Sequence, residues 1–226
     1  MNASAQNVRL AREILSRLNQ LSVPNTEAVR AVRREFSHRI ADMPPESVVQ
    51  LTLMLVTSGS DLLRFFSYEL VNRHRPTLDQ LTADDLLKLG KGINSWASVD
   101  CFAMYLSGPS WGKGRVSDKT IATWARSQDC WWRRAALVST VTLSRRGTSE
   151  DLRRATSICA LLVADREDTV VKALSWALRE IAKKHPKEAR SFLAEHGHAL
   201  AARVLREVNN KLKTGVKTPR RRAIKA

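Results

Sequence analysis

Helical periodicity runs through almost the whole chain, whereas signals for β-strands are nearly absent. Runs of β-branched residues with a period of two are missing, and only nine glycines interrupt the 226 residues. Prolines separate the apolar stripes: Pro44 and Pro45 precede one predicted helix, and Pro186 precedes another. The chain is therefore predicted to be all-α.

Twelve predicted helices cover roughly residues 4–21, 26–41, 45–58, 60–74, 78–90, 94–107, 118–127, 130–146, 149–164, 168–184, 186–196 and 198–213. Many helices joined by short turns favour an α-solenoid over a closed bundle. One predicted connection is longer. Residues 107–118, SGPSWGKGRVSD, are glycine-rich and basic, and they form either an insertion on a binding face or a plain loop between repeats.

The net charge of +16 and the isoelectric point near 10.6 favour a polyanionic partner, of which nucleic acid is the commonest soluble example. A membrane surface is the rival partner. No segment has the roughly 18 to 20 apolar residues of a spanning helix, and the N-terminus lacks the apolar run of a signal peptide. We expect a monomer that binds double-stranded DNA, binds no membrane, and is located in the bacterial cytoplasm or nucleoid.

The sequence predicts one repeat domain over residues 1–213 and a flexible basic tail over residues 214–226. The tail sequence TGVKTPRRRAIKA has too little apolar surface to fold, and its cations suit sequence-independent contacts with phosphates.

Neither a metal site nor a cofactor is expected. Cys101, Cys130 and Cys159 are far apart, and no Cys/His cluster has zinc spacing. His196 and His198 flank a glycine, which indicates the end of a helix and a turn rather than half a metal site. The chain has no phosphate-binding loop, dinucleotide fingerprint or hydrolase nucleophile motif.

Two tryptophans, one aspartate and one arginine recur at intervals of about 40 residues, which is the period of HEAT-type repeats: Trp96 and Asp100, then Arg134, then Trp176. In such repeats equivalent helices line one concave face, and here that face is predicted to be a basic groove. Trp96 and Asp100 are four residues apart, so they share one side of a helix. An indole attracts positive charge and a carboxylate stabilises it, which suits a cationic base. The alternative for Asp100 is a helix cap or an ion pair with a neighbouring helix.

Trp176 is predicted to lie in a basic stripe with Lys172, Arg179 and Lys183, opposite the apolar stripe of the same helix. This setting suits stacking on a nucleotide with phosphates alongside. The alternative is a tryptophan that packs on a neighbouring repeat under lysine side chains.

Arg133 and Arg134 follow two tryptophans, and at most one of the two arginines is expected to be buried. One arginine is predicted to face the groove as a phosphate-binding residue, and the other is predicted to pair with an acid on the next repeat.

At these residues the chain resembles the AlkD-like alkylpurine DNA glycosylases, the DNA alkylation repair proteins built from HEAT-like repeats. The resemblance covers residues 60–210 well and residues 20–60 loosely, and it centres on SWASVD, DCWWRRAAL and KALSWALREIAKKHP. It implies that Trp96 and the essential Asp100 form one wall of the site and that Trp176 forms the other. It also implies that Arg134 contacts the DNA backbone.

The resemblance further implies a monofunctional glycosylase that removes N3- or N7-alkylated purines from DNA by hydrolysing the N-glycosidic bond. The tryptophans would hold the cationic nucleotide, and Asp100 would stabilise an oxocarbenium-like transition state or position water, without a deep base pocket. The alternative function is a non-catalytic HEAT-repeat protein that binds DNA of unusual shape or serves as a scaffold. A carboxylate facing phosphates weakens binding, so Asp100 favours the enzyme.

Well-known members of that family enclose the lesion with a tyrosine on the N-terminal repeat. No aromatic residue precedes Phe36 in this chain. Either Phe36, Phe65, Phe66 or Tyr68 takes that place, or the site is more open.

Overall fold

The structure, a computed structural model, describes residues 3–219, and over this range it consists of helices and turns without a β-strand. The predicted all-α class is confirmed. No helix in the described range is both long enough and apolar enough to span a bilayer. The chain forms two compact units, Met1–Ser117 and Asp118–Ala226.

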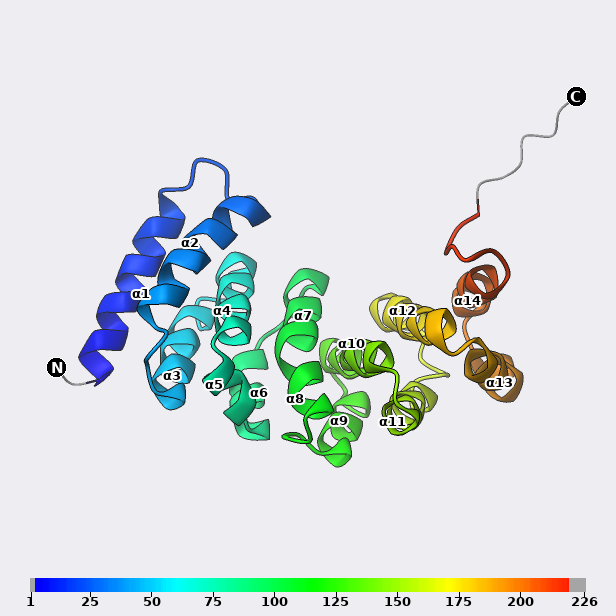
Figure 1. Ribbon diagram of the computed structural model, residues 1–226. Coiled ribbons are helices and arrows are strands. Elements are labelled where there is room, and N and C mark those ends of the chain that lie inside the picture. The colour runs from blue at the N-terminus through cyan, green and yellow to red at the C-terminus, as the bar shows by residue number, and fades with distance from the viewer. Residues whose placement is uncertain (1–2, 220–226) are drawn as a thin grey trace, which may run out of the picture. The chain divides into compact units, whose positions relative to one another are not determined.

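The N-terminal unit is built from two layers of helices (Figure 1). Helices α2, α4 and α7 pack side by side in one layer, and α1, α3, α5 and α6 form the other. Buried aromatic side chains join neighbouring helices of the first layer, such as Phe36 of α2 and Phe66 of α4, which form an edge-to-face pair with ring centroids 6.4 Å apart. The elements are α1 (Ala3–Asn19), α2 (Thr26–Arg39), α3 (Pro45–Val56), α4 (Asp61–Arg73), α5 (Arg75–Gln80), α6 (Ala83–Gly90), α7 (Trp96–Phe102), a π-helical turn (Ala103–Ser107) and α8 (Gly108–Gly112).

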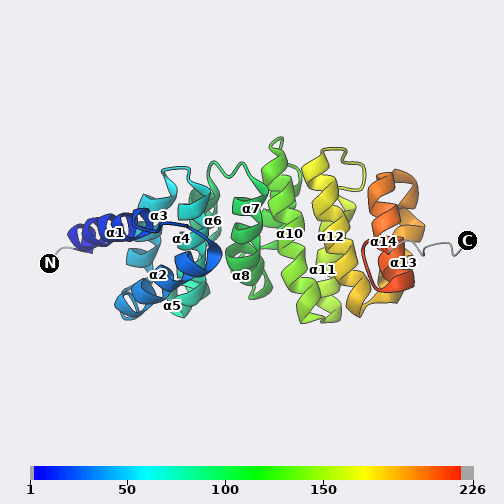
Figure 2. The same cartoon turned by 90° about the horizontal axis from the view of Figure 1, so that it is seen from above.

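The C-terminal unit also has two layers, seen from above in Figure 2. Helix α12 packs between α10 and α14, and these three helices form one layer. Helices α9, α11 and α13 form the second layer and pack against the first. The elements are α9 (Asp118–Ala125), α10 (Cys130–Arg146), α11 (Ser149–Ala160), α12 (Asp168–Lys184), α13 (Pro186–His196), a 3-10 turn (Gly197–Ala199) and α14 (Ala202–Thr214).

Helix boundaries follow the capping residues. The predicted helices 130–146, 168–184 and 186–196 are confirmed to the residue. A single helix over 78–90 is wrong, because Thr82 and Asp85 form a reciprocal capping box that starts a new helix. The last predicted helix starts later than residue 198, since the chain after His196 first makes the 3-10 turn.

The predicted loop over residues 107–118 is also wrong for its first half. The helix that begins at Trp96 continues through the π-helical turn into α8, and only residues 113–117 connect it to α9. Pro109 follows directly after the π-helical turn, in the first turn of α8. The Trp111 side chain is fully buried, so its packing holds this glycine-rich segment in helical form.

Residues 214–219 of the predicted tail belong to the described part of the chain. Gly215 ends α14 in a left-handed conformation with φ of 76°, which glycine adopts without strain. Lys217 then returns to the helix, where its carbonyl accepts a hydrogen bond from Asn210 Nδ2 at 3.1 Å and its Nζ lies 3.4 Å from Glu207. The rest of the predicted tail, residues 220–226, lies outside the described residues.

Candidate functional site

A cleft of about 460 Å³ opens in the N-terminal unit where α2, α4 and α7 begin. It contains both residues of the predicted Trp–Asp pair. Trp96 and Asp100 contribute from the first turns of α7, and the other two helices supply apolar walls. The lining residues are Pro24, Thr26, Val29, Asp61, Leu62, Phe65, Trp96, Ala97, Asp100 and Cys101.

Trp96 is 68% exposed although it is the largest type of apolar side chain. Ser95 caps α7 by accepting a hydrogen bond from the backbone N–H of Ser98 at 3.1 Å, which makes Trp96 the first helical residue. A helical side chain lies over the turn that precedes it, and at the first residue no such turn exists. The indole therefore extends beyond the helix end into the mouth of the cleft, while Val99 and Phe102 bury the opposite side of α7.

Asp61 is a second carboxylate in the cleft, and the sequence reasoning missed it. The hydroxyl of Ser95 lies 2.9 and 2.8 Å from the two carboxylate oxygens of Asp61. This contact joins the beginnings of α4 and α7, so it helps to position Trp96. Acidic residues are common at the start of a helix, so nothing in the sequence singles out Asp61. Its contact with a serine of a separate helix is visible only in the structure.

Phe65 is the only one of the four candidate aromatic residues that lines the cleft. Phe36, Phe66 and Tyr68 are completely buried in the core. The cleft thus has an aromatic side chain from α4 as well as the indole from α7. Sequence periodicity could not separate Phe65 from Phe66, since both are apolar neighbours in one helix.

Cys101 lines the cleft beside Asp100, but its chemistry is that of a neutral thiol. Burial, reinforced by the negative charge of Asp100, raises the pKa of Cys101 to about 12. A thiol with such a pKa is protonated at neutral pH and is a poor nucleophile.

The C-terminal unit contains the second predicted tryptophan. Trp176 lies in the middle of α12 and is half-buried, so it belongs neither to the core nor to the fully exposed surface. Each cation of the predicted stripe faces an acid: Lys172 lies 2.5 Å from Asp168, Lys183 lies 2.8 Å from Glu180, and Arg179 lies 3.8 Å from Glu207. Each of these acids also faces a second cation, namely Arg203 at Asp168, Arg145 at Glu180 and Lys217 at Glu207, so positive charge remains in excess around the stripe.

The two predicted arginines of α10 have different surroundings. Arg133 pairs with an acid, as predicted for one of them: its Nε donates to Asp165 at 2.7 Å. Arg134 is only 7% exposed, and its Nη1 donates to the backbone carbonyl of Thr169 at 2.6 Å. Arg134 thus connects α10 to the first turn of α12, and its contact with a DNA phosphate stays a prediction.

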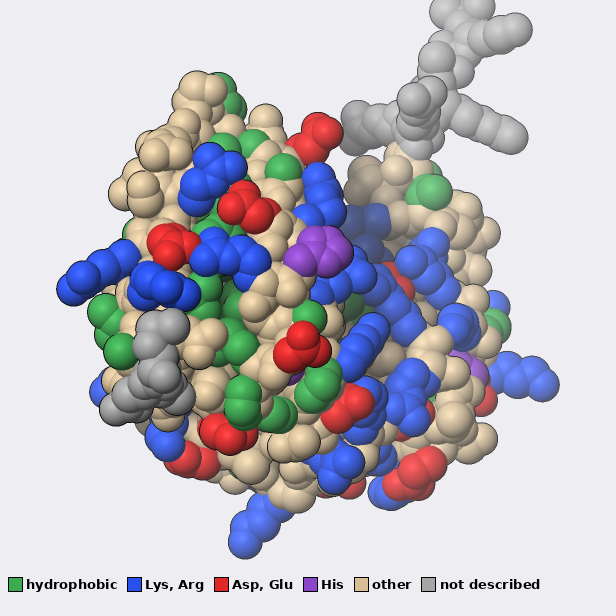
Figure 3. Space-filling model, turned by 60° about the vertical axis from the view of Figure 1, so that its left-hand side comes forward, with side chains coloured by type: hydrophobic (Ala, Val, Ile, Leu, Met, Phe, Trp, Pro, Cys, Tyr) green, Lys and Arg blue, Asp and Glu red, His purple; other side chains and the backbone are tan. Residues whose placement is uncertain are grey.

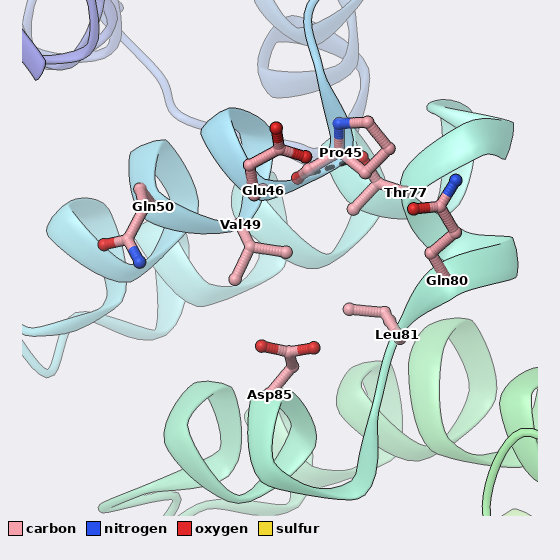
Figure 4. Close-up of a pocket in the computed structure, with 8 residues that line it drawn as sticks. All are labelled: Pro45, Glu46, Val49, Gln50, Thr77, Gln80, Leu81 and Asp85. Carbon is pink, nitrogen blue, oxygen red and sulfur yellow. Dashed lines mark hydrogen bonds between the residues drawn. The ribbon is translucent and has the colours of Figure 1, made fainter. Parts of the chain in front are cut away.

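A smaller cavity of about 160 Å³ lies in the other layer of the N-terminal unit, between α3, α5 and α6 (Figure 4). Glu46 on α3 and Asp85 on α6 line it from opposite sides. The Asp85 carboxylate accepts a hydrogen bond from the backbone N–H of Thr82 at 3.0 Å, so it serves to begin α6. None of the predicted site residues lines this cavity.

Basic side chains are spread over the face in Figure 3, with acidic side chains between them. Within residues 3–219, no group of three or more His, Cys, Asp and Glu residues is placed to hold a metal ion. The cleft offers two aromatic side chains, Trp96 and Phe65, and two carboxylates, Asp61 and Asp100. These groups attract a positively charged, planar ligand.

A comparison with known protein families places the chain in one of them. The chain matches the profile of the family described as DNA alkylation repair enzyme over residues 17–212, a range that includes most of both units. A search of curated proteins found none that matches the chain. The family match spans the Trp96 cleft and the helices that carry Arg134 and Trp176, and the chain therefore belongs to the DNA alkylation repair enzyme family.

Proposed function

We propose that the protein is a DNA glycosylase that removes positively charged N3- or N7-alkylated purines. The observation that carries this proposal is the exposed indole of Trp96 beside Asp100 in a cleft with Phe65. An exposed tryptophan next to a carboxylate has no evident use in packing. Both groups stabilise a cation, and an alkylated purine nucleotide is a cation before and during loss of its base.

The proposed reaction breaks the bond between C1′ and the purine nitrogen, whose electron pair leaves with the alkylpurine as a neutral base. A water molecule forms the new bond to C1′ and releases one proton to solvent. Alkylation already makes the purine a good leaving group, so no strong general acid is required. Trp96 and Phe65 hold the nucleotide, with Phe65 in the role that a tyrosine has in the family's well-known members. Asp100 stabilises the oxocarbenium-like sugar in the transition state or positions the water.

At the level of the whole chain, we propose an α-solenoid of HEAT-like repeats with a basic concave groove that binds duplex DNA. In this arrangement Trp176 holds the nucleotide from the C-terminal unit. Arg134, with Arg133 and the cations of α12, contacts the backbone. The protein acts as a monomer in the bacterial cytoplasm or nucleoid and needs neither a metal nor a cofactor.

The test is incubation of the protein with methylated duplex DNA, followed by chromatographic detection of free 3-methyladenine or 7-methylguanine. Asp100→Asn is the diagnostic variant, and Asp84→Asn is the matched control, because Asp84 is an exposed aspartate on α6, away from the cleft. The proposal expects base release by the wild type and by Asp84→Asn, and much slower release by Asp100→Asn. No release above the spontaneous rate by any of them would favour the non-catalytic DNA-binding or scaffold function.

A further inference from the structure

An arginine lies at the edge of the cleft in the N-terminal unit. The guanidinium carbon of Arg30, on α2, lies 5.7 Å from the ring centroid of Phe65, which lines the cleft. The residue before it, Val29, is also part of the cleft wall. Arg30 therefore borders the space where the nucleotide would be held.

The Arg30 side chain is held in place from two neighbouring elements. Its Nε donates to the carboxylate of Glu69 on α4 at 2.8 Å, and its Nη2 lies 3.4 Å from the hydroxyl of Tyr105 in the π-helical turn. Glu69 is 4% exposed, so its position is fixed by packing. The hydrogen bond with Glu69 raises the pKa of Arg30, and the guanidinium remains charged.

The charge around Glu69 is not balanced. Arg33 lies 3.7 Å from the other oxygen of Glu69, so two guanidiniums face one carboxylate. Arg34 and Arg73 add further positive charge close to Arg33. Of the pair that faces Glu69, Arg30 is the one that reaches solvent, with 42% of its side chain exposed, against 10% for Arg33.

A fixed, charged and solvent-accessible guanidinium beside a nucleotide-sized cleft suits the phosphate that the same nucleotide carries. We propose that Arg30 binds a phosphate of the DNA backbone next to the nucleotide in the cleft, in a position set by Glu69 and Tyr105. The proposal rests on the function proposed above. It adds a backbone contact from the N-terminal unit to those predicted for the C-terminal unit, and it does not assign Arg30 to the chemical step.

The test uses duplex DNA with a tetrahydrofuran abasic-site analogue at one position, so that binding is measured without base release. A neutral methylphosphonate replaces one phosphate at a time on either side of the analogue. The proteins are the wild type, Arg30→Ala and Arg17→Ala. Arg17 is a matched control because it is an exposed arginine on α1, in the other layer, and is also paired with a glutamate.

For the wild type and Arg17→Ala, we expect neutralisation of one flanking phosphate to weaken binding about tenfold. Arg30→Ala should bind the unmodified duplex about tenfold more weakly and should be insensitive to that replacement, since the two changes remove the same contact. The affinity of Arg30→Ala should depend on salt less steeply than that of the wild type, by roughly the amount expected for one phosphate contact. Arg30→Ala leaves the buried Glu69 with Arg33 as its remaining ion-pair partner, so thermal unfolding of the three proteins is measured as well, to separate a loss of stability from the loss of a phosphate contact.

If Arg30→Ala binds like Arg17→Ala, or keeps the wild-type sensitivity at every phosphate, the proposed contact is wrong. Base release by the wild type separates this result from failure of the glycosylase assignment. Release with no Arg30 effect contradicts the phosphate contact alone. Absence of release contradicts the proposed function itself.

Discussion

In the N-terminal unit Trp96 is the first residue of its helix and is 68% exposed, whereas in the C-terminal unit Trp176 lies in the middle of α12 and is half-buried. The ionic surroundings differ as well. The cleft around Trp96 contains Asp61 and Asp100, while the cations near Trp176 face acids of α12 and α14. The same residue type at repeat spacing thus has two settings. The N-terminal setting suits contact with a reacting cation, and the C-terminal setting suits lateral support.

The comparison is tested most strongly by Asp100→Asn. This change keeps the size and most of the hydrogen bonding but removes the charge that stabilises the developing cation. Stabilisation of about 3 to 4 kcal/mol corresponds to a 10²- to 10³-fold slower single-turnover excision. Affinity for undamaged DNA should stay level or improve, since a charge repelled by phosphates has been removed. Excision at the wild-type rate would make Asp100 a structural residue and would remove the chemical distinction between the units.

The two tryptophans provide the next test. Trp96→Ala should slow excision about ten- to a hundredfold, which is the order expected for loss of one stacking contact. It should leave the melting temperature nearly unchanged, because the indole is largely exposed. Trp176→Ala should lower both excision and melting temperature, because its half-buried indole also contacts neighbouring side chains. Calorimetry beside single-turnover kinetics measures both effects, and equal loss of stability in the two variants would contradict the contrast.

Arg134→Ala tests whether the C-terminal unit combines support with DNA binding. Loss of the buried hydrogen bonds to Thr169 should lower the free energy of unfolding by about 1.5 to 3 kcal/mol. DNA binding should weaken, with a smaller effect on the excision rate at saturation. Arg153→Ala is the control, because its ion pair with Glu150 on α11 is exposed on both sides and its loss should change the stability little. Urea unfolding and titration with labelled duplex give the two quantities. Unchanged binding by a folded Arg134→Ala would exclude a backbone contact.

Deletion of residues 214–226 should have the smallest effect on chemistry. The loss of Lys217, Arg220, Arg221, Arg222 and Lys225 should make the dependence of affinity on salt less steep, because fewer counterions are displaced. Preference for alkylated over intact DNA should persist, since phosphate contacts do not specify the lesion. Fluorescence anisotropy at several salt concentrations with both duplexes measures this. Loss of discrimination would show that the tail contributes to lesion recognition as well as to affinity.

The sequence by itself determined the all-α class, most helix boundaries and the Trp96–Asp100 pair. These features depend on local physics: a period of 3.6 residues, capping side chains, and the rule that residues four apart share a face. The family was also evident from the sequence, because its motifs are short and contiguous. The error over residues 107–112 has a physical cause: glycine and proline predict a loop locally, and the buried Trp111 overrides them through contacts that are not local.

Tertiary structure alone decided which groups meet in the cleft and how each charge is used. Phe65 lines the cleft, whereas Phe36, Phe66 and Tyr68 are buried in the core. Asp61 is distinguished from other acids at helix starts by its contact with Ser95 of a separate helix. Likewise, Glu69 fixes Arg30 although the two are far apart in the chain. A side chain's exposure and its ionic partner depend on the neighbouring helices, and one-dimensional periodicity carries no information about which helix lies beside which.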